Sequence, residues 1–229
     1  SHAEDMEISP WDYRLAEDIE TVRNCWLSEY YQTRLHMCHV STRGAIEAIQ
    51  MAKLRGAPVT CEVTPHHLWF TNDTCDYRVN PPIRTADDVQ ALIDAIRSGV
   101  VDAIATDHAP HSAEEKTRPL TDAPSGMVGL ETALAVALTY LYHTGEMALS
   151  DILRRMTINP ACILRLPTKG RLAIGSDGDV VIFDPDEAWT VDPNRFASKG
   201  RNTPFAGKTL RGKVKYTIVG GEIVYWEGE

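Results

Sequence analysis

Short apolar segments alternate with amphipathic segments along the first two-thirds of the chain, and this pattern limits the fold more than any other. The strand-like segments, apolar and bounded by polar residues, are 34–41, 57–64 and 100–107. The segments with apolar residues at helical spacing are 43–55, 85–99, 129–142 and 149–158, the last ending before Pro160. Such alternation predicts βα units around a parallel sheet.

The pattern changes at about Lys169. Glycine-rich turns and short alternating strands follow, in "GSDGDVVIFD" and "GKVKYTIVGGEIVYWEG". Gly220-Gly221 separates two such strands, which predicts a β-hairpin turn. The last sixty or so residues are therefore expected to form a small β unit.

Composition and charge exclude several classes of protein. The 229 residues carry a formal net charge of −9, from 32 acidic and 23 basic residues, which argues against nucleic-acid binding through phosphate contacts. The apolar runs are too short for a membrane helix, and the first residues do not resemble a signal peptide. The five cysteines form no CxxC pair, which favours reduced thiols and a cytoplasmic protein over a disulfide framework.

Residues able to bind a metal follow each of the three predicted strands. They are His39; His66 and His67; and Asp107, His108 and His111. His2 is a fourth candidate, at the start of the chain. The carboxyl ends of successive strands meet at one mouth of a (β/α) barrel, and imidazole and carboxylate are ligands that suit zinc. A single histidine beside a strand is more often a hydrogen-bonded structural residue, but several at strand ends together favour a metal site.

Four motifs carry a resemblance to a known family. They are "NPPIRTADDVQALIDAI", "ATDHAPHSAEEK", "GLETALAV" and "SKGRNTPFAGKTLRGKV". In this order they resemble the dihydroorotases, zinc amidohydrolases of pyrimidine biosynthesis that interconvert L-dihydroorotate and N-carbamoyl-L-aspartate. Allantoinases and dihydropyrimidinases share the barrel and the strand-end aspartate but fit "DHAPHSAEEK" and "NPPIR" less well.

The resemblance implies roles for individual residues. His2 and His39 correspond to ligands of the second of two zinc ions, and Asp107 to a ligand of the first zinc that also moves the proton. The residues implied to bind the anionic substrate are Asn80, His111, Pro124, Ser125 and Gly126. The tandem His66-His67 is interpreted as structural, because the resemblance assigns the metal elsewhere. An accessory ion beside Cys38 and Glu62 is conceivable, but a buried thiol is the preferred interpretation.

The resemblance also implies an earlier half that is not found here. The family's His-x-His pair, its bridging lysine or aspartate and a substrate-binding arginine have no counterpart, since no two of the eight histidines are separated by one residue. We therefore expect an α/β chain with two parts: residues 1–168 as the second half of a metal-dependent (β/α)8 TIM barrel, and 169–229 as part of a flanking β-sandwich. Activity is expected only with the N-terminal half, in an enzyme that we expect to form a homo-oligomer.

A second interpretation remains open. The chain could belong to a non-catalytic homologue that keeps the fold to bind a partner such as aspartate transcarbamoylase. Degenerate homologues usually lose the metal-binding aspartate first, so the presence of Asp107 favours the enzyme.

Overall fold

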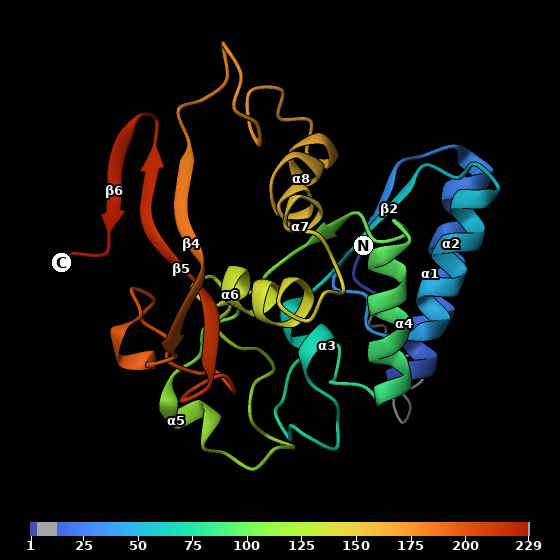
Figure 1. Cartoon of the computed structure of the whole chain (residues 1–229). Helices are drawn as coiled ribbons and strands as arrows, with labels where there is room; N and C mark the ends of the chain where they lie inside the picture. Colours follow the sequence, from blue (N-terminus) through green and yellow to red (C-terminus); the bar gives the residue numbers. More distant parts are fainter. Residues whose placement is uncertain (4–12, 229) are drawn as a thin grey trace.

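A computed structural model describes residues 1–3 and 13–228 (Figure 1). In chain order the elements are α1 (Tyr13–Tyr31), β1 (Leu35–Met37), α2 (Arg43–Leu54), β2 (Val59–Val63), α3 (Pro65–Trp69), α4 (Ala86–Arg97), β3 (Ala103–Ile104), α5 (Ala113–Lys116), α6 (Ala133–Ala137), the π-helical turn η1 (Leu138–Tyr142), α7 (Leu149–Met156), α8 (Ile158–Ile163), β4 (Val180–Thr190), the 3₁₀ turn η2 (Pro193–Arg195), β5 (Thr209–Val219) and β6 (Glu222–Trp226).

The first three strands form a parallel sheet in the order β1-β2-β3, as the alternation of segments predicts. His36 lies beside Thr60 in the β1–β2 register, and Glu62 lies beside Ala103 in the β2–β3 register. The start of the chain continues this sheet on the free side of β1. The Ser1 amino group donates to the His36 carbonyl, and the Cys38 amide donates to the Ser1 carbonyl at 2.9 Å.

Helices cover one face of the parallel sheet. Helices α1, α2 and α4 lie side by side next to β1 and β2 in Figure 1. Ile49 of α2 and Ile96 of α4 are fully buried in the core that also contains Met37 of β1. Thr85 caps α4 through a reciprocal capping box with Asp88, as its position before the apolar periodicity predicts. Burial of these apolar helix faces therefore determines which face of the parallel sheet the helices cover.

The last three strands form a separate antiparallel sheet in the order β4-β5-β6. Val219 pairs with Glu222, so Gly220 and Gly221 form the two-residue hairpin turn that the sequence predicts. Both glycines have positive φ, 60° and 88°, which side chains disfavour. The described strands here make one sheet, so the second layer of a sandwich remains a prediction.

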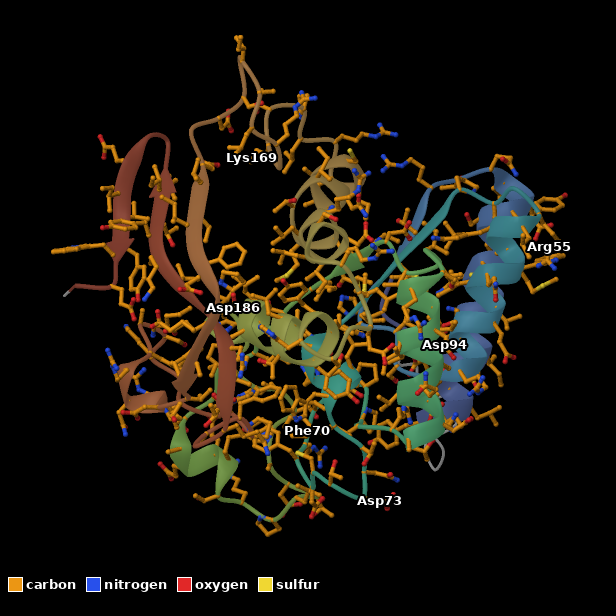
Figure 2. The ribbon with its side chains drawn as sticks, viewed as in Figure 1. Arg55, Phe70, Asp73, Asp94, Lys169 and Asp186 are labelled. Carbon is orange, nitrogen blue, oxygen red and sulfur yellow. The ribbon has the colours of Figure 1, made fainter. Side chains whose placement is uncertain are left out.

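A second, aromatic core joins the two parts of the chain. The Phe70 and Phe205 rings lie 4.8 Å apart, and both belong to a cluster that includes Val191 and Leu210 of the antiparallel sheet region. In Figure 2 Phe70 lies in the interior, whereas Asp73, three residues later, lies on an outer loop. The cluster packs the loops beyond the parallel sheet against β4 and β5.

Several sequence-based expectations differ from the structure. The helix predicted over 149–158 is α7, which ends at Met156, before Pro160 as expected, but an unpredicted second helix, α8, begins at Ile158 and carries Pro160 in its first turn. A proline is tolerated there because its missing N–H would have no partner within the helix. Helix α1 was not predicted, and the parallel strands are shorter than the apolar segments that contain them. The described residues form no closed barrel.

Among the described residues, none of the helices is both long and apolar enough to cross a membrane.

Candidate metal centre and substrate loops

His2 and His39 meet at the carboxyl end of the parallel sheet. His2 Nδ1 lies 2.5 Å from His39 Nε2, and the ring centroids are 4.6 Å apart. His39 follows β1 and is 4% exposed, whereas His2 is held beside it by the pairing of Ser1 with β1. The two imidazole nitrogens thus face each other at hydrogen-bonding distance, and the two rings lie close enough to be ligands of one metal ion.

Asp107 lies at the same end of the sheet, after β3. The Ala105 amide donates to the Val63 carbonyl at 3.0 Å, which continues the parallel pairing almost to Asp107. The Asp107 carboxylate is near enough to the Cys38 thiol to contribute to raising that thiol's pKa, after burial and Glu62. Asp107 does not, however, join His2 and His39 in a compact three-ligand group among the described residues.

The backbone is unusual at both strand ends. His39 has φ +36° and Asp107 has φ +47°, a region that non-glycine residues rarely adopt. Only four non-glycine residues in the described parts of the chain have positive φ, and these are two of them. Backbone strain of this kind concentrates at functional sites.

The tandem histidines after β2 are buried and neutral. His67 Nε2 donates to the Pro81 carbonyl at 2.9 Å, and its Nδ1 lies 2.8 Å from the Thr64 hydroxyl. Burial lowers the pKa of His67 to about 3 and holds the pKa of His66 well below its usual value. Both His67 nitrogens are therefore hydrogen-bonded, and the bond to Pro81 holds the residue that follows Asn80, which supports a structural role for His67.

Four of the five predicted substrate residues share one loop system. His111 Nε2 donates to the Ser125 carbonyl at 2.8 Å, next to Pro124 and Gly126. A side chain at Gly126, which has φ +127°, would clash with Ala109. Asn80 belongs to the neighbouring loop, which is linked to this one by the Gly126 amide donating to the Arg78 carbonyl at 3.0 Å.

Two residues that the sequence did not single out brace these loops. The Asn202 side chain accepts from the His111 amide at 2.9 Å and donates to the Gly126 carbonyl at 3.1 Å. The Lys116 ammonium donates to the carbonyls of Pro124 and Gly126 at 3.0 and 3.1 Å. Both lie within the quoted motifs "SKGRNTPF" and "SAEEK", so the signal was present but no role was attached to it.

A buried ion pair links the metal and substrate sides. Glu17 of α1 accepts from the Ser41 and Thr42 amides at 2.7 and 3.2 Å, just after His39. Arg84, four residues after Asn80, donates to Glu17 at 2.9 Å and to the Ser41 hydroxyl at 2.9 Å. The two side chains are 3% and 10% exposed, so the pair fixes the His39 loop to the Asn80 loop within the core.

Comparisons with curated proteins find dihydroorotases. The chain is 47% identical over 225 residues to the dihydroorotase of Clostridium botulinum (strain Eklund 17B / Type B), covering 98% of this chain and 55% of that protein. It is 48% identical over 221 residues to the dihydroorotase of Anaeromyxobacter dehalogenans (strain 2CP-C), covering 93% and 51%. The chain thus spans about half the length of these relatives.

Solved structures give the same fold. An L-hydantoinase (dihydropyrimidinase) from Arthrobacter aurescens matches with a TM-score of 0.88 and 32% identity, over 94% of this chain and 50% of that one. A D-hydantoinase from Thermus sp. matches with a TM-score of 0.87 and 24% identity, over the same shares. The sequence profile of the amidohydrolase family matches residues 14–224. The chain therefore belongs to the amidohydrolase family.

Proposed function

We propose that this chain is the C-terminal part of a dihydroorotase, which interconverts L-dihydroorotate and N-carbamoyl-L-aspartate in pyrimidine biosynthesis. The observation that carries the proposal is the 47–48% identity to dihydroorotases along 93–98% of the chain. The proximity of His2 and His39, at the same end of the sheet as Asp107, supports the proposal. Metal-dependent hydrolysis in a barrel enzyme needs metal ligands at the carboxyl ends of the parallel strands.

The proposed architecture is the second half of a (β/α)8 barrel over residues 1–168, followed by part of a flanking β domain over 169–229. Among the residues that the structure describes, helices cover one face of the parallel sheet, and the alternate residues of β2 on the other face are half-buried. The N-terminal half of the same enzyme would complete the barrel over that face. A cytoplasmic homo-oligomer, with aspartate transcarbamoylase as a candidate partner, remains part of this prediction.

The described residues fit part of a two-zinc centre. His2 and His39 offer two nitrogens to one ion and Asp107 offers a carboxylate to the other, whereas a catalytic zinc normally takes three protein ligands. The remaining ligands would come from the earlier half. Zinc bound there would supply a Lewis acid for the amide carbonyl and an activated water.

Asp107 is the proposed acid and base. Its carboxylate would accept the proton of the attacking water and deliver it to the ring nitrogen as the amide bond breaks. In the direction of ring closure the same carboxylate would take the proton from the nitrogen. The strained backbone at Asp107 supports this role, since it fixes where the side chain points.

His111 and Asn80 are proposed to bind the substrate's carboxylate. Because His111 Nε2 already donates to the Ser125 carbonyl, a second hydrogen bond from Nδ1 to an anion requires the doubly protonated imidazolium. The backbone of Pro124, Ser125 and Gly126 would then contact the dihydropyrimidine ring. The charge-assisted hydrogen bond orients the ring for attack.

The test is a substrate panel with the complete protein. Ring opening of L-dihydroorotate is expected to exceed that of hydantoin, dihydrouracil and allantoin, because those rings lack the carboxylate. His111→Ala should chiefly raise KM for dihydroorotate, with a smaller effect on kcat. His67→Ala should be the milder change in KM. Preference for a ring without a carboxylate would reject the proposal.

A second candidate function is hydrolysis of another cyclic amide. The likeness to the L-hydantoinase, at 32% identity, favours it as the alternative. Turnover of hydantoin or dihydrouracil in the same panel would support this candidate. No turnover of any ring by the metal-loaded complete protein would instead favour the non-catalytic partner subunit.

A further inference from the structure

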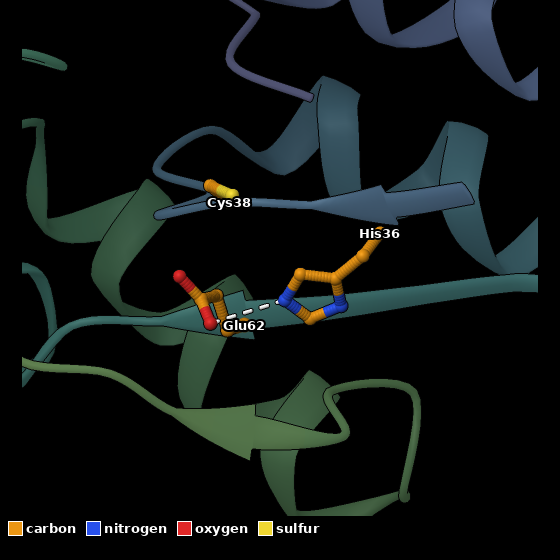
Figure 3. A group of neighbouring side chains, drawn as sticks. All are labelled: His36, Cys38 and Glu62. Carbon is orange, nitrogen blue, oxygen red and sulfur yellow. Dashed lines mark hydrogen bonds and ion pairs between the residues drawn. The ribbon is translucent and has the colours of Figure 1, made fainter. Parts of the chain in front are cut away.

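The substrate loops are held differently from the strands that precede them. Within the parallel sheet, side chains of neighbouring strands hold one another, as His36 of β1 and Glu62 of β2 do across 3.0 Å (Figure 3). The loops that contain His111 and Gly126 are joined by a segment much later in the chain, residues 196–205 between η2 and β5. The part of the chain that forms the antiparallel sheet therefore reaches the substrate loops.

The Asn202 side chain makes three hydrogen bonds to the main chain of these loops. Its Oδ1 accepts from the His111 amide at 2.9 Å, and its Nδ2 donates to the Gly126 and Ala109 carbonyls at 3.1 and 3.3 Å. Asn202 is 8% exposed, so water does not readily replace these bonds. A carboxamide offers an acceptor and two donors on one short side chain, whereas a carboxylate offers acceptors alone.

Asn202 fixes His111 relative to the loop of residues 124–126. The His111 ring is bound to that loop through Nε2 and the Ser125 carbonyl at 2.8 Å, and its main chain is bound to Asn202. The Gly126 carbonyl accepts from both Asn202 and the Lys116 ammonium, each at 3.1 Å. Both ends of His111 are therefore held at a set distance from the loop.

Asn202 is itself held in place by its own segment. The Glu131 carboxylate accepts from the amides of residues 197 and 198, both at 3.1 Å. Gly200 lies against the loop of His111, where a Cβ would be 2.7 Å from Pro110 Cβ and 3.0 Å from Asn202 Oδ1. This close approach leaves the Asn202 amide little freedom to move away from the loops.

We propose that Asn202 is a positioning residue for the carboxylate end of the substrate, and that its neutral amide keeps His111 where it can bind that carboxylate. This rests on the proposed function, which assigns the substrate's carboxylate to His111 and Asn80. Asn202 acts through the main chain of His111 and Gly126. Its loss should therefore weaken binding of L-dihydroorotate more than it slows cleavage of the amide bond, which is assigned to the metal centre and Asp107.

The test is Asn202→Asp in the complete, metal-loaded protein. The substitution keeps the shape of the side chain but turns an oxygen toward two carbonyl oxygens and adds a negative charge near the anion site. KM for L-dihydroorotate should rise at least about tenfold, because buried main-chain groups lose their partner. The value of kcat should change less than about threefold. A residue needed for folding alone would reduce the amount of active protein and leave KM unaltered.

Asn159→Asp is the matched control. The half-buried Asn159 Nδ2 donates to the Asp102 carbonyl at 2.8 Å, just before β3 and thus at the opposite end of the sheet from Asp107. The same chemical change here should leave KM unaltered. An unaltered KM in Asn202→Asp, or an equal rise of KM in both variants, would overturn the proposal.

A second variant covers the case in which Asn202→Asp does not fold. Gly200→Ala keeps every polar group and presses a methyl group against Pro110 and the Asn202 amide, so it should raise KM in the same direction by a smaller factor. An unaltered KM in this variant would also overturn the proposal.

Hydrogen–deuterium exchange separates this proposal from the proposed function. Exchange of the main-chain amides of residues 108–128 in the complete protein should be faster in Asn202→Asp, since the His111 amide loses its place, while exchange in α4 should be unaltered. Absence of dihydroorotate turnover in the unaltered protein would reject the proposed function. Unaltered exchange of residues 108–128 would reject the role of Asn202 whichever ring the protein opens.

Discussion

The two sheets of the molecule use the alternation of side chains in different ways. In the parallel sheet, Met37, Cys61 and Val63 are completely buried under helices, while the residues between them, such as Thr60 and Glu62, are polar and half-buried. In the antiparallel sheet every residue of β6 is exposed, including the apolar Ile223 and Val224. The parallel sheet therefore has an apolar core on one face and polar side chains on the other, whereas the antiparallel sheet exposes apolar residues to solvent.

This difference follows from how each sheet is connected. Parallel strands need crossover helices, which bury one face and bring the carboxyl ends of all strands to one edge. The β5–β6 pairing is set locally by the Gly220-Gly221 turn and needs no other element. Changes in the parallel sheet should consequently affect stability and activity strongly, and comparable changes in the antiparallel sheet should affect them little.

The largest expected effect concerns the open face of the parallel sheet. Residues 1–229 expressed alone should show no ring opening and should not retain two zinc ions, because the described ligands are too few for two catalytic sites. Metal analysis and a dihydroorotate assay against the complete protein measure this. Two bound zincs with full activity would mean that the centre is built from other residues of this chain.

Asp107→Asn in the complete protein should lower kcat by about 10²–10⁴-fold, because an amide cannot carry the proton. Glu222→Gln, at the start of exposed β6, makes the same kind of change in the other sheet and should leave kcat unaltered. Steady-state kinetics on matched preparations decide between them. Near-normal turnover of the Asn variant would reject the role given to Asp107.

Glu17→Ala should lower the free energy of unfolding by about 3–5 kcal/mol, because it leaves the buried Arg84 charge and two amides without their partner. Lys215→Ala removes the ion pairs of a half-exposed β5 side chain with Glu187 and Glu227, which solvent screens, and should cost little. Urea denaturation of both variants gives the comparison. Equal losses would show that the two sheets do not differ in this way.

Acid should weaken the parallel-sheet region first. His67 stays neutral when folded, with a pKa of about 3, but takes up a proton when unfolded, so stability falls as pH drops from about 6.5 toward 3. Between pH 7 and 5 this amounts to about 2 kcal/mol for His67, and His66 adds to it. None of the eight histidines lies in residues 180–226. Unfolding measured at both pH values should therefore show a smaller loss in His67→Gln; an unchanged loss would contradict this.

The sequence by itself determined the local elements and the order of chemistry-bearing residues. The periodicity of 43–55 and 85–99, the Thr85 cap and the Gly220-Gly221 turn each depend on neighbours within a few residues, and all appear as expected. The placement of His39 and Asp107 after strands follows from the same patterns. Helix α1 was not predicted from the sequence. Its inner side buries polar residues such as Glu17 and Glu20, while Trp26 and Tyr30 are exposed, which inverts the usual periodicity.

Only the tertiary structure decided which distant residues meet. The bond of His67 to Pro81, the pairing of Glu17 with Arg84 and the grouping of His36 and Cys38 with Glu62 join segments 14 to 67 residues apart. Such contacts depend on strand register and on which side chains the helices bury, and a shift of one residue would turn every side chain of a strand to the other face. The sequence therefore carries the residues of the sites, whereas the packing of helices on the sheet determines which of them can act together.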